Sequence, residues 1–320
     1  MKVVNINTDK SLSIIDVNKP KIKDGEVLIK TYFAALNRAD VLQREGNYPP
    51  PIGWPEWMGL EVSGVVEEVG KDVSNIKVGE KVCALLGGGG YAEYVAVPAE
   101  LVVSVGEMAL DTACCIPEVY STAYLNLFLE GNLQEGQTVL VHAGASGVGI
   151  AVTQIAKLFG AKVIATVRSA EKVKAIKKFG ADIIVNSKDV DLVNLFEQNP
   201  IDIVIDCVGG DLAGKCFTKM NRGGKWICIA TLGGDMTQID LREVYKKGVR
   251  LIGSTLRSRA NEVKGQILNL LKKDIFPHII SGKIVPEIHK VFDFKDVEQA
   301  QQEMIENKNI GKILLKVTDL

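Results

Sequence analysis

The fold is decided by one stretch near the middle of the chain, Thr138-Val139-Leu140-Val141-His142-Ala143-Gly144-Ala145-Ser146-Gly147-Val148-Gly149. A short β-branched run leads into a glycine-rich turn, and apolar residues at helical spacing follow until Gly160. A strand, a tight turn and a helix in this order form an anion-binding site from main-chain N–H groups. We predict that Ser146, Gly147 and Val148 hold the pyrophosphate of a dinucleotide. An ordinary strand-to-helix turn remains an alternative, because Ser146 replaces the middle glycine of the G-x-G-x-x-G pattern.

The residues after the next expected strand, 162–167, predict which dinucleotide binds. An NAD site carries an Asp or Glu here, about 20 residues after the glycine turn, to bind the ribose. This chain has Arg168 and Ser169 instead, with Lys172 one helical turn further on. A guanidinium, a hydroxyl and an ammonium all bind a 2′-phosphate, which a carboxylate would repel. We therefore predict NADPH as the cofactor; the alternative is a solvated basic helix start that binds no nucleotide.

Strand-like and helix-like stretches alternate to about residue 257. The pattern predicts a helix at 170–179 and strands at 182–186, 201–208, 225–231 and 251–255. This alternation is typical of an α/β fold with a doubly wound parallel sheet and helices on both faces. Ligands bind beyond the carboxyl ends of such strands. The candidate cofactor contacts at these ends are Ser187, Cys207, Val208, Thr231, Leu256 and Arg257.

Composition excludes several classes of function. The 320 residues suffice for two domains. The 38 Lys and Arg residues nearly balance the 39 Asp and Glu residues, so no basic field favours nucleic acid. No apolar run approaches the roughly 18 residues of a membrane span, and the first residues do not resemble a secretory signal. Six cysteines without a C-x-x-C pair indicate buried thiols in a reducing compartment. We expect a cytoplasmic protein that binds neither nucleic acid nor membrane.

A second domain surrounds the nucleotide domain in the sequence. Before residue 118, short alternating runs at 26–30, 61–66, 81–85 and 91–97 are separated by glycine- and proline-containing turns. This spacing predicts a barrel-like β-domain. After residue 257, the pattern predicts helices at 261–273 and 297–305 and strands at 284–286 and 312–317. We therefore predict one domain from residues 1–118 and 258–320, with the Rossmann domain, 119–257, inserted in it.

Several motifs resemble a known superfamily. They lie in order along nearly the whole chain, at residues 35–40, 59–64, 88–95, 142–149, 256–259 and 306–313. On these segments the chain resembles the medium-chain dehydrogenase/reductase superfamily. Within it, the chain resembles the zinc-free quinone oxidoreductase branch, and there the p53-inducible quinone oxidoreductase type.

The resemblance implies a GroES-like β-barrel domain beside the Rossmann domain, and NADPH-dependent hydride transfer to a small quinone-like substrate. It also implies a homodimer in which residues 249–254 continue the sheet across the interface. Two alternatives stay open: an NADPH-dependent reductase of 2-enoyl thioesters or enones, and a non-catalytic NADPH-binding protein.

No metal is expected in this branch. The zinc enzymes of the superfamily carry a ligating Cys in the first conserved segment, where this chain has Asn37 and Arg38. They carry Gly-His-Glu where this chain has Gly59-Leu60-Glu61, and a leucine cannot bind zinc. Glu61 is therefore expected to be structural.

The resemblance also suggests site residues. Tyr48 and Asn37 are the candidate catalytic residues, and Asn37, Thr122 and Asn309 are candidate cofactor contacts. A quinone accepts electrons readily, so the enzyme mainly has to hold its ring against the nicotinamide. For each residue a plain role is also open: Asn37 as a turn residue before a helix, Tyr48 as a surface side chain, and Thr122 as a helix cap.

Overall fold

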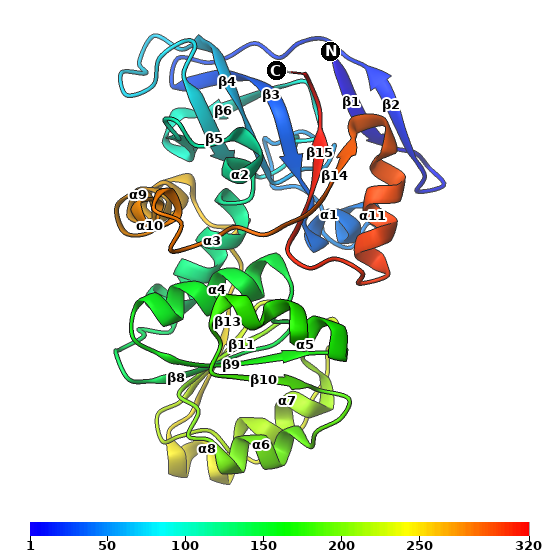
Figure 1. Ribbon diagram of the computed structural model, residues 1–320. Coiled ribbons are helices and arrows are strands. Elements are labelled where there is room, and N and C mark those ends of the chain that lie inside the picture. The colour runs from blue at the N-terminus through cyan, green and yellow to red at the C-terminus, as the bar shows by residue number, and fades with distance from the viewer. Residues whose placement is uncertain (320) are drawn as a thin grey trace. The chain divides into compact units, whose positions relative to one another are not determined.

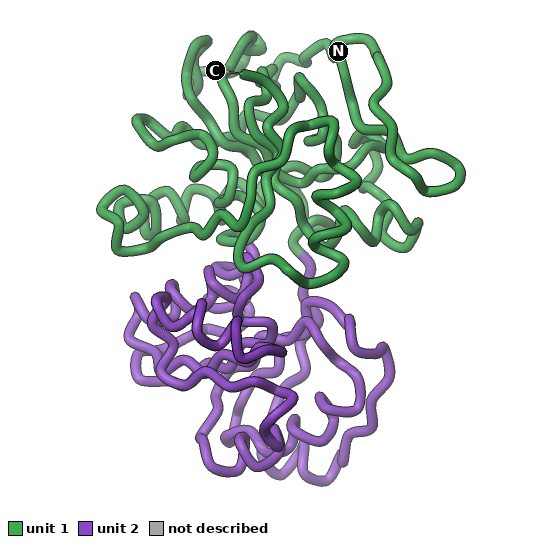
Figure 2. Tube along the Cα trace, turned by 45° about the vertical axis from the view of Figure 1, so that its right-hand side comes forward, with its two compact units in different colours: residues 1–121, 256–320 green, residues 122–255 purple. Residues whose placement is uncertain are grey.

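The chain divides into two compact units. The computed structural model describes residues 1–319. Unit 1 comprises residues 1–121 together with the chain from Leu256 onward, and unit 2 comprises residues 122–255 (Figure 2). The boundaries predicted from the sequence, 118/119 and 257/258, differ from these by a few residues. Leu256 and Arg257 therefore belong to unit 1 rather than to the predicted nucleotide domain.

Unit 2 is built around a six-stranded sheet in which every pair of neighbouring strands is parallel. Its strands are β8 (Thr138–Val141), β9 (Lys162–Val167), β10 (Ile183–Asn186), β11 (Ile203–Asp206), β12 (Lys225–Cys228) and β13 (Arg250–Gly253). They lie in the order β10-β9-β8-β11-β12-β13, so the direction of winding reverses between β8 and β11. This is the doubly wound arrangement predicted from the alternation of strands and helices.

Helices cover both faces of this sheet. They are α4 (Gly147–Leu158), α5 (Ala170–Ile176), α6 (Leu192–Gln198), α7 (Gly210–Phe217) and α8 (Leu241–Lys247). Helices α4 and α5 lie on one face and α6, α7 and α8 on the other (Figure 1). Between the sheet and the second helix layer, Trp226 stacks on Phe196 at a ring-centroid distance of 5.8 Å. Burying two large aromatic side chains in contact contributes strongly to the stability of this layer.

Unit 1 is built on a seven-stranded sheet of segments from both ends of the chain. The strands are β3 (Glu26–Ala35), β4 (Glu61–Val69), β5 (Lys81–Leu85), β6 (Tyr94–Pro98), β7 (Val102–Ser104), β14 (Ile288–Asp293) and β15 (Lys312–Lys316). They follow the order β14-β15-β3-β4-β5-β7, with β6 also paired to β3. A separate hairpin consists of β1 (Lys2–Ile6) and β2 (Leu12–Asp16). The fold is thus a GroES-like domain together with a Rossmann-type parallel sheet, as the resemblance implied.

Helices complete unit 1. They are α1 (Arg38–Arg44), α2 (Leu110–Cys114), α9 (Asn261–Asp274), α10 (Phe276–Ile280) and α11 (Val297–Ile305), and α3 (Pro117–Tyr124) runs across the boundary into unit 2. The helices predicted at 261–273 and 297–305 are confirmed. The prediction of a strand at 284–286 is wrong. Pro286 cannot donate a main-chain hydrogen bond, and the strand begins two residues later, as β14.

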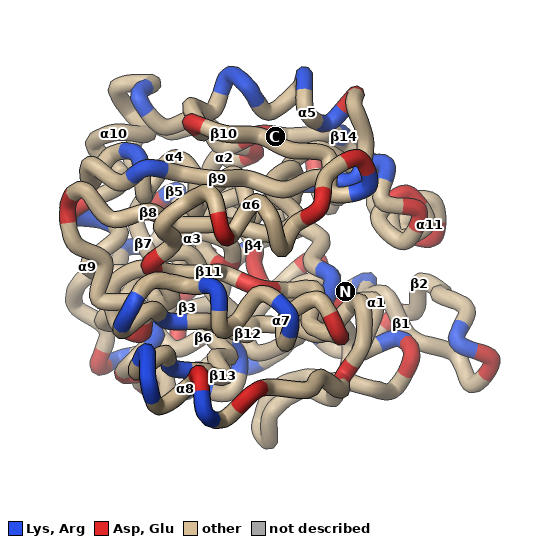
Figure 3. Tube along the Cα trace, turned by 90° about the horizontal axis from the view of Figure 1, so that it is seen from below, with Lys and Arg blue, Asp and Glu red and all other residues tan. Residues whose placement is uncertain are grey.

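Basic and acidic residues are interspersed in both units (Figure 3). None of the helices within residues 1–319 combines the length and the apolar character that crossing a bilayer requires.

Candidate functional site

The glycine turn of unit 2 is shaped by close main-chain contacts. Ser146 precedes α4, and its hydroxyl accepts a hydrogen bond from the Gly149 amide at 3.0 Å. A Cβ atom on Gly149 would lie 2.4 Å from the Ala143 carbonyl oxygen, and one on Gly144 would lie 2.9 Å from the Ala165 Cβ. Only glycine allows α4 to start so close to the end of β8. The turn therefore presents the N-terminus of a twelve-residue helix, with Gly147 and Val148 as its first residues.

The predicted cofactor residues of unit 2 lie after successive strands. Ser146, Gly147 and Val148 follow β8, Arg168 and Ser169 follow β9, Ser187 follows β10, Cys207 and Val208 follow β11, and Thr231 follows β12. Because the strands are parallel, their carboxyl ends meet at one edge of the sheet. A hydrogen bond of 2.7 Å from the Ser187 amide to the Val167 carbonyl joins two of these strand ends directly. The structure thus brings these residues together along one edge.

The basic residues after β9 are placed to receive an anion. Arg168 is exposed, and Ser169 caps α5 by accepting a hydrogen bond from the Lys172 amide at 3.3 Å. Lys172 is therefore fixed in the first turn of α5, where the helix dipole also favours negative charge. A glycine cradle for a pyrophosphate and a basic group one strand away fit a phosphorylated dinucleotide.

Asp206 is a structural residue of this edge that the sequence analysis missed. Its buried carboxylate accepts hydrogen bonds from the Val208 amide at 2.7 Å, the Gly209 amide at 3.1 Å and the Trp226 indole at 2.9 Å. Gly209 has a φ of +66°, which suits glycine. The sequence feature that could have predicted this role is an aspartate that ends an apolar strand and directly precedes a glycine-containing turn. Asp206 holds the main chain at Val208 in one conformation.

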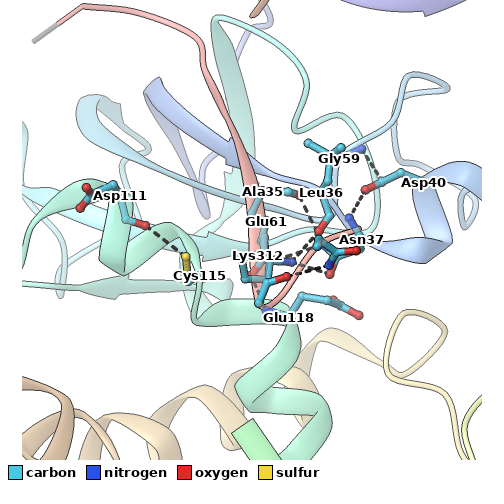
Figure 4. A network of polar contacts seen from close by, with 12 residues as sticks. Ala35, Leu36, Asn37, Asp40, Gly59, Glu61, Asp111, Cys115, Glu118 and Lys312 are labelled. Atoms are coloured by element: carbon cyan, nitrogen blue, oxygen red, sulfur yellow. Dashed lines mark hydrogen bonds and ion pairs between the residues drawn. The ribbon is translucent and has the colours of Figure 1, made fainter. Parts of the chain in front are cut away.

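A buried ion pair occupies the centre of unit 1. The Lys312 ammonium lies 2.7 Å from a carboxylate oxygen of Glu61, and both side chains are buried. Asn37 joins them, because its amide nitrogen donates to Glu61 at 3.0 Å and its oxygen accepts from Lys312 at 2.8 Å (Figure 4). Burial disfavours the Lys312 ammonium, but the adjacent Glu61 carboxylate outweighs it and holds the pKa of Lys312 above its usual value. Glu61 is therefore structural, as predicted, and Asn37 is part of the same network.

Two further carboxyl groups border this network. Asp40 accepts hydrogen bonds from the main-chain N–H of Asn37 at 2.7 Å and from the Tyr91 hydroxyl at 2.9 Å. Burial raises the pKa of Asp40 to about 6. Glu118 donates its main-chain N–H to Glu61 at 2.8 Å, and burial together with the Glu61 charge raises the pKa of Glu118 to about 8. The Oε2 atom of Glu118 is buried and has no hydrogen-bond partner within residues 1–319.

Tyr48 is held by Arg257. The Arg257 guanidinium donates to the Tyr48 carbonyl at 3.0 Å and to the Gln43 side chain at 2.7 Å, and it lies 5.0 Å from the centre of the Tyr48 ring. Burial and the nearby Glu118 charge raise the pKa of the Tyr48 phenol, and Arg257 opposes this. Arg257 is thus buried in unit 1 as a support for Tyr48, because its hydrogen-bond partners are residues of that unit.

The other predicted residues fall at separate places. Thr122 lies inside α3 rather than at its start, so it is not the cap of that helix, and its main-chain carbonyl accepts a hydrogen bond from the Asn126 side chain. Asn309 lies before β15 and donates to the Gly311 carbonyl at 2.8 Å, and Leu256 is buried at the start of the second segment of unit 1. Leu60 is buried beside Glu61. Among residues 1–319, no cluster of three or more His, Cys, Asp or Glu side chains is arranged to hold a metal ion.

Comparison with known proteins agrees with this architecture. Residues 23–107 match the alcohol dehydrogenase GroES-like domain family, and residues 147–273 match the zinc-binding dehydrogenase family. The chain is 31% identical to the synaptic vesicle membrane protein VAT-1 homolog of Danio rerio, over 96% of this chain and 67% of the relative. It is 29% identical to quinone oxidoreductase-like protein 2 of Bos taurus, over 96% of this chain and 90% of the relative.

Solved structures give the same result. A mycobacterial protein crystallised with NADPH superposes with a TM-score of 0.88 at 26% identity, and the match covers 99% of this chain and all of the other. The similarity in sequence and in fold extends over nearly the full length of this chain. The chain therefore belongs to the medium-chain dehydrogenase/reductase superfamily of oxidoreductases.

Proposed function

We propose that this oxidoreductase uses NADPH to reduce a quinone, without a metal ion. The observation that carries the proposal is the set of residues after β9, where Arg168, Ser169 and Lys172 stand in place of a ribose-binding carboxylate. The NADPH bound to the mycobacterial neighbour and the quinone oxidoreductase-like name of the bovine relative support it.

The residues divide by role. Ser146, Gly147 and Val148 hold the pyrophosphate, and Arg168, Ser169 and Lys172 hold the 2′-phosphate. When bound, NADPH supplies hydride from its nicotinamide ring. Tyr48, fixed by Arg257, binds the acceptor ring by stacking or through its hydroxyl. Asn37 does not contact the substrate but helps to position the residues around it, because both ends of its side-chain amide are already bonded to Glu61 and Lys312.

The buried ion pair supports a reaction that needs no zinc. Glu61 is already neutralised by Lys312, and Leu60 offers no ligand atom. Elemental analysis of the purified, active protein is therefore expected to give far less than one metal ion per chain. Stoichiometric zinc that activity requires would contradict this part of the proposal.

Cofactor preference tests the central observation. We expect kcat/KM to be higher for NADPH than for NADH. We expect Lys172→Ala to lower kcat/KM for NADPH about 10-fold or more, since a charge-assisted hydrogen bond contributes about 1.5–3 kcal/mol, while NADH turnover stays unchanged. Lys174→Ala, on an exposed position of the same helix, is the matched control. Equal loss with both cofactors, or a wild-type preference for NADH, would refute the assignment.

The acceptor is tested by a panel. Turnover of 1,2-naphthoquinone well above that of crotonyl-CoA would support quinone reduction. The reverse order would favour the 2-enoyl thioester reductase alternative, and tight NADPH binding without oxidation by any acceptor would favour the non-catalytic alternative.

A further inference from the structure

A buried lysine of unit 1, Lys264, lies beside an aromatic ring and has no ion pair within residues 1–319. Lys264 lies in the first turn of α9, and only 2% of the residue is exposed. Its ammonium lies over the Trp54 indole, whose ring centre is 6.0 Å away. A buried ammonium normally has a carboxylate or several acceptors, because desolvating it costs several kcal/mol.

Packing connects Lys264 to the support of Tyr48. The Trp54 ring lies against Gly87, where a Cβ atom would be 2.5 Å from the indole nitrogen. The Gly87 carbonyl in turn accepts a hydrogen bond from Arg257 at 2.7 Å, and Arg257 holds Tyr48. Lys264, Trp54, Arg257 and Tyr48 therefore form one cluster in unit 1, which is open to solvent at the half-buried Tyr48 and Trp54.

Glu118 is the acidic residue that influences Lys264 electrostatically. Burial lowers the pKa of Lys264, and the Glu118 carboxylate opposes that shift. The Oε2 atom of Glu118 is also buried and unpartnered within residues 1–319. The Glu118 Oε2 atom therefore has hydrogen-bonding capacity left for another group, and an unsatisfied buried atom of this kind marks a candidate functional site.

We propose that Lys264 donates a hydrogen bond to the substrate oxygen that becomes an anion during reduction. This deepens the proposed function and rests on it. When hydride adds to a conjugated carbonyl compound, the carbonyl π electron pair moves onto oxygen, and the negative charge stays there until a proton from water neutralises it. A preorganised ammonium stabilises that charge. The substrate class is therefore a quinone or enone whose oxygen reaches the cluster past Tyr48.

The test uses 4-nitrophenol, a ring compound whose absorbance reports whether its oxygen is ionised. We expect the full-length protein to bind the phenolate form preferentially and so lower the apparent pKa of the bound probe. Lys264→Met should abolish this shift and weaken phenolate binding at least 10-fold, while NADPH affinity stays unchanged. Lys273→Met, at an exposed position of the same helix, should behave like wild type. Urea unfolding checks that Lys264→Met folds. We expect its free energy of unfolding to be at least that of wild type, since an unpaired buried charge is removed.

The outcomes separate the two proposals. With 1,2-naphthoquinone, Lys264→Met should lose roughly 10²–10³-fold in kcat, as removal of an oxyanion donor does elsewhere. If wild type reduces quinones but Lys264→Met matches it in both turnover and phenolate binding, the role of Lys264 is refuted and the proposed function stands. If wild type reduces no acceptor yet shows a Lys264-dependent phenolate shift, the proposed function fails and Lys264 remains an anion-binding residue.

Discussion

At the scale of single residues, unit 1 depends on a buried charge pair. Glu61 and Lys312 lie 251 positions apart in the chain and meet on β4 and β15, two strands that both flank β3. Such a pair is costly to break, because a buried charge is left without a partner, while replacing both charges together is often nearly neutral. The pair also holds neighbouring segments in place, because Glu61 accepts hydrogen bonds from the Asn37 side chain and from the main-chain N–H of Glu118 at the start of α3.

We expect Lys312→Met to lower the free energy of unfolding of unit 1 by about 3–5 kcal/mol. Glu61→Gln combined with Lys312→Met should recover most of that loss, because no charge remains buried. Lys316→Met, at the exposed end of the same strand, serves as control and should change stability by less than about 0.5 kcal/mol. Urea unfolding followed by tryptophan fluorescence measures all three. If the double variant is no more stable than Lys312→Met, the unpaired charge of Glu61 is not the cause of the lost stability.

At the scale of elements, the nucleotide edge is set by how closely α4 follows β8. Ser146 caps the helix, and Gly149 lies against the Ala143 carbonyl, so the turn has no room for a side chain. Asp206 performs the corresponding task at the end of β11, through the amides of Val208 and Gly209. The edge is thus positioned by main-chain contacts that strands and helices impose on each other.

Gly149→Ala should therefore weaken NADPH binding by about 10-fold or more, since overpacking against main chain typically costs about 1–3 kcal/mol and here displaces the helix N-terminus. Gly25→Ala is the control, because nothing lies within 4 Å of a Cβ atom at that position. Titration calorimetry measures both dissociation constants. Unchanged affinity of Gly149→Ala would mean that the turn does not contact the nucleotide.

At the scale of the whole molecule, the parallel sheet of unit 2 ends in an unprotected strand. Among the strands of residues 1–319, β13 pairs only with β12, and Leu251 on β13 is 55% exposed. An exposed apolar edge strand is prone to pair with another chain. The resemblance to the quinone oxidoreductase branch implies a homodimer, and we propose that β13 of one protomer pairs with β13 of its partner.

Light scattering is expected to give about twice the 34.7 kDa mass of one chain. Leu251→Lys should shift the protein to the monomer mass by placing charge at the interface. Leu232→Lys, at another exposed apolar position outside any strand, should remain dimeric. A monomeric wild-type protein would exclude the dimer, and a dimeric Leu251→Lys would place the interface elsewhere.

Local patterns in the sequence determined the alternating strands and helices of unit 2, the capped glycine turn and the basic residues after β9. Each of these depends on residues close together in the chain, where periodicity, capping and φ preferences act directly. The tertiary structure alone decided which distant side chains meet. Only in the folded structure do Glu61 and Lys312 form an ion pair. Arg257 lies in unit 1 and holds Tyr48, although the sequence placed it in the nucleotide domain, and Lys264 is buried beside Trp54. No local pattern encodes such pairs, because long-range contacts follow from how whole strands and helices pack.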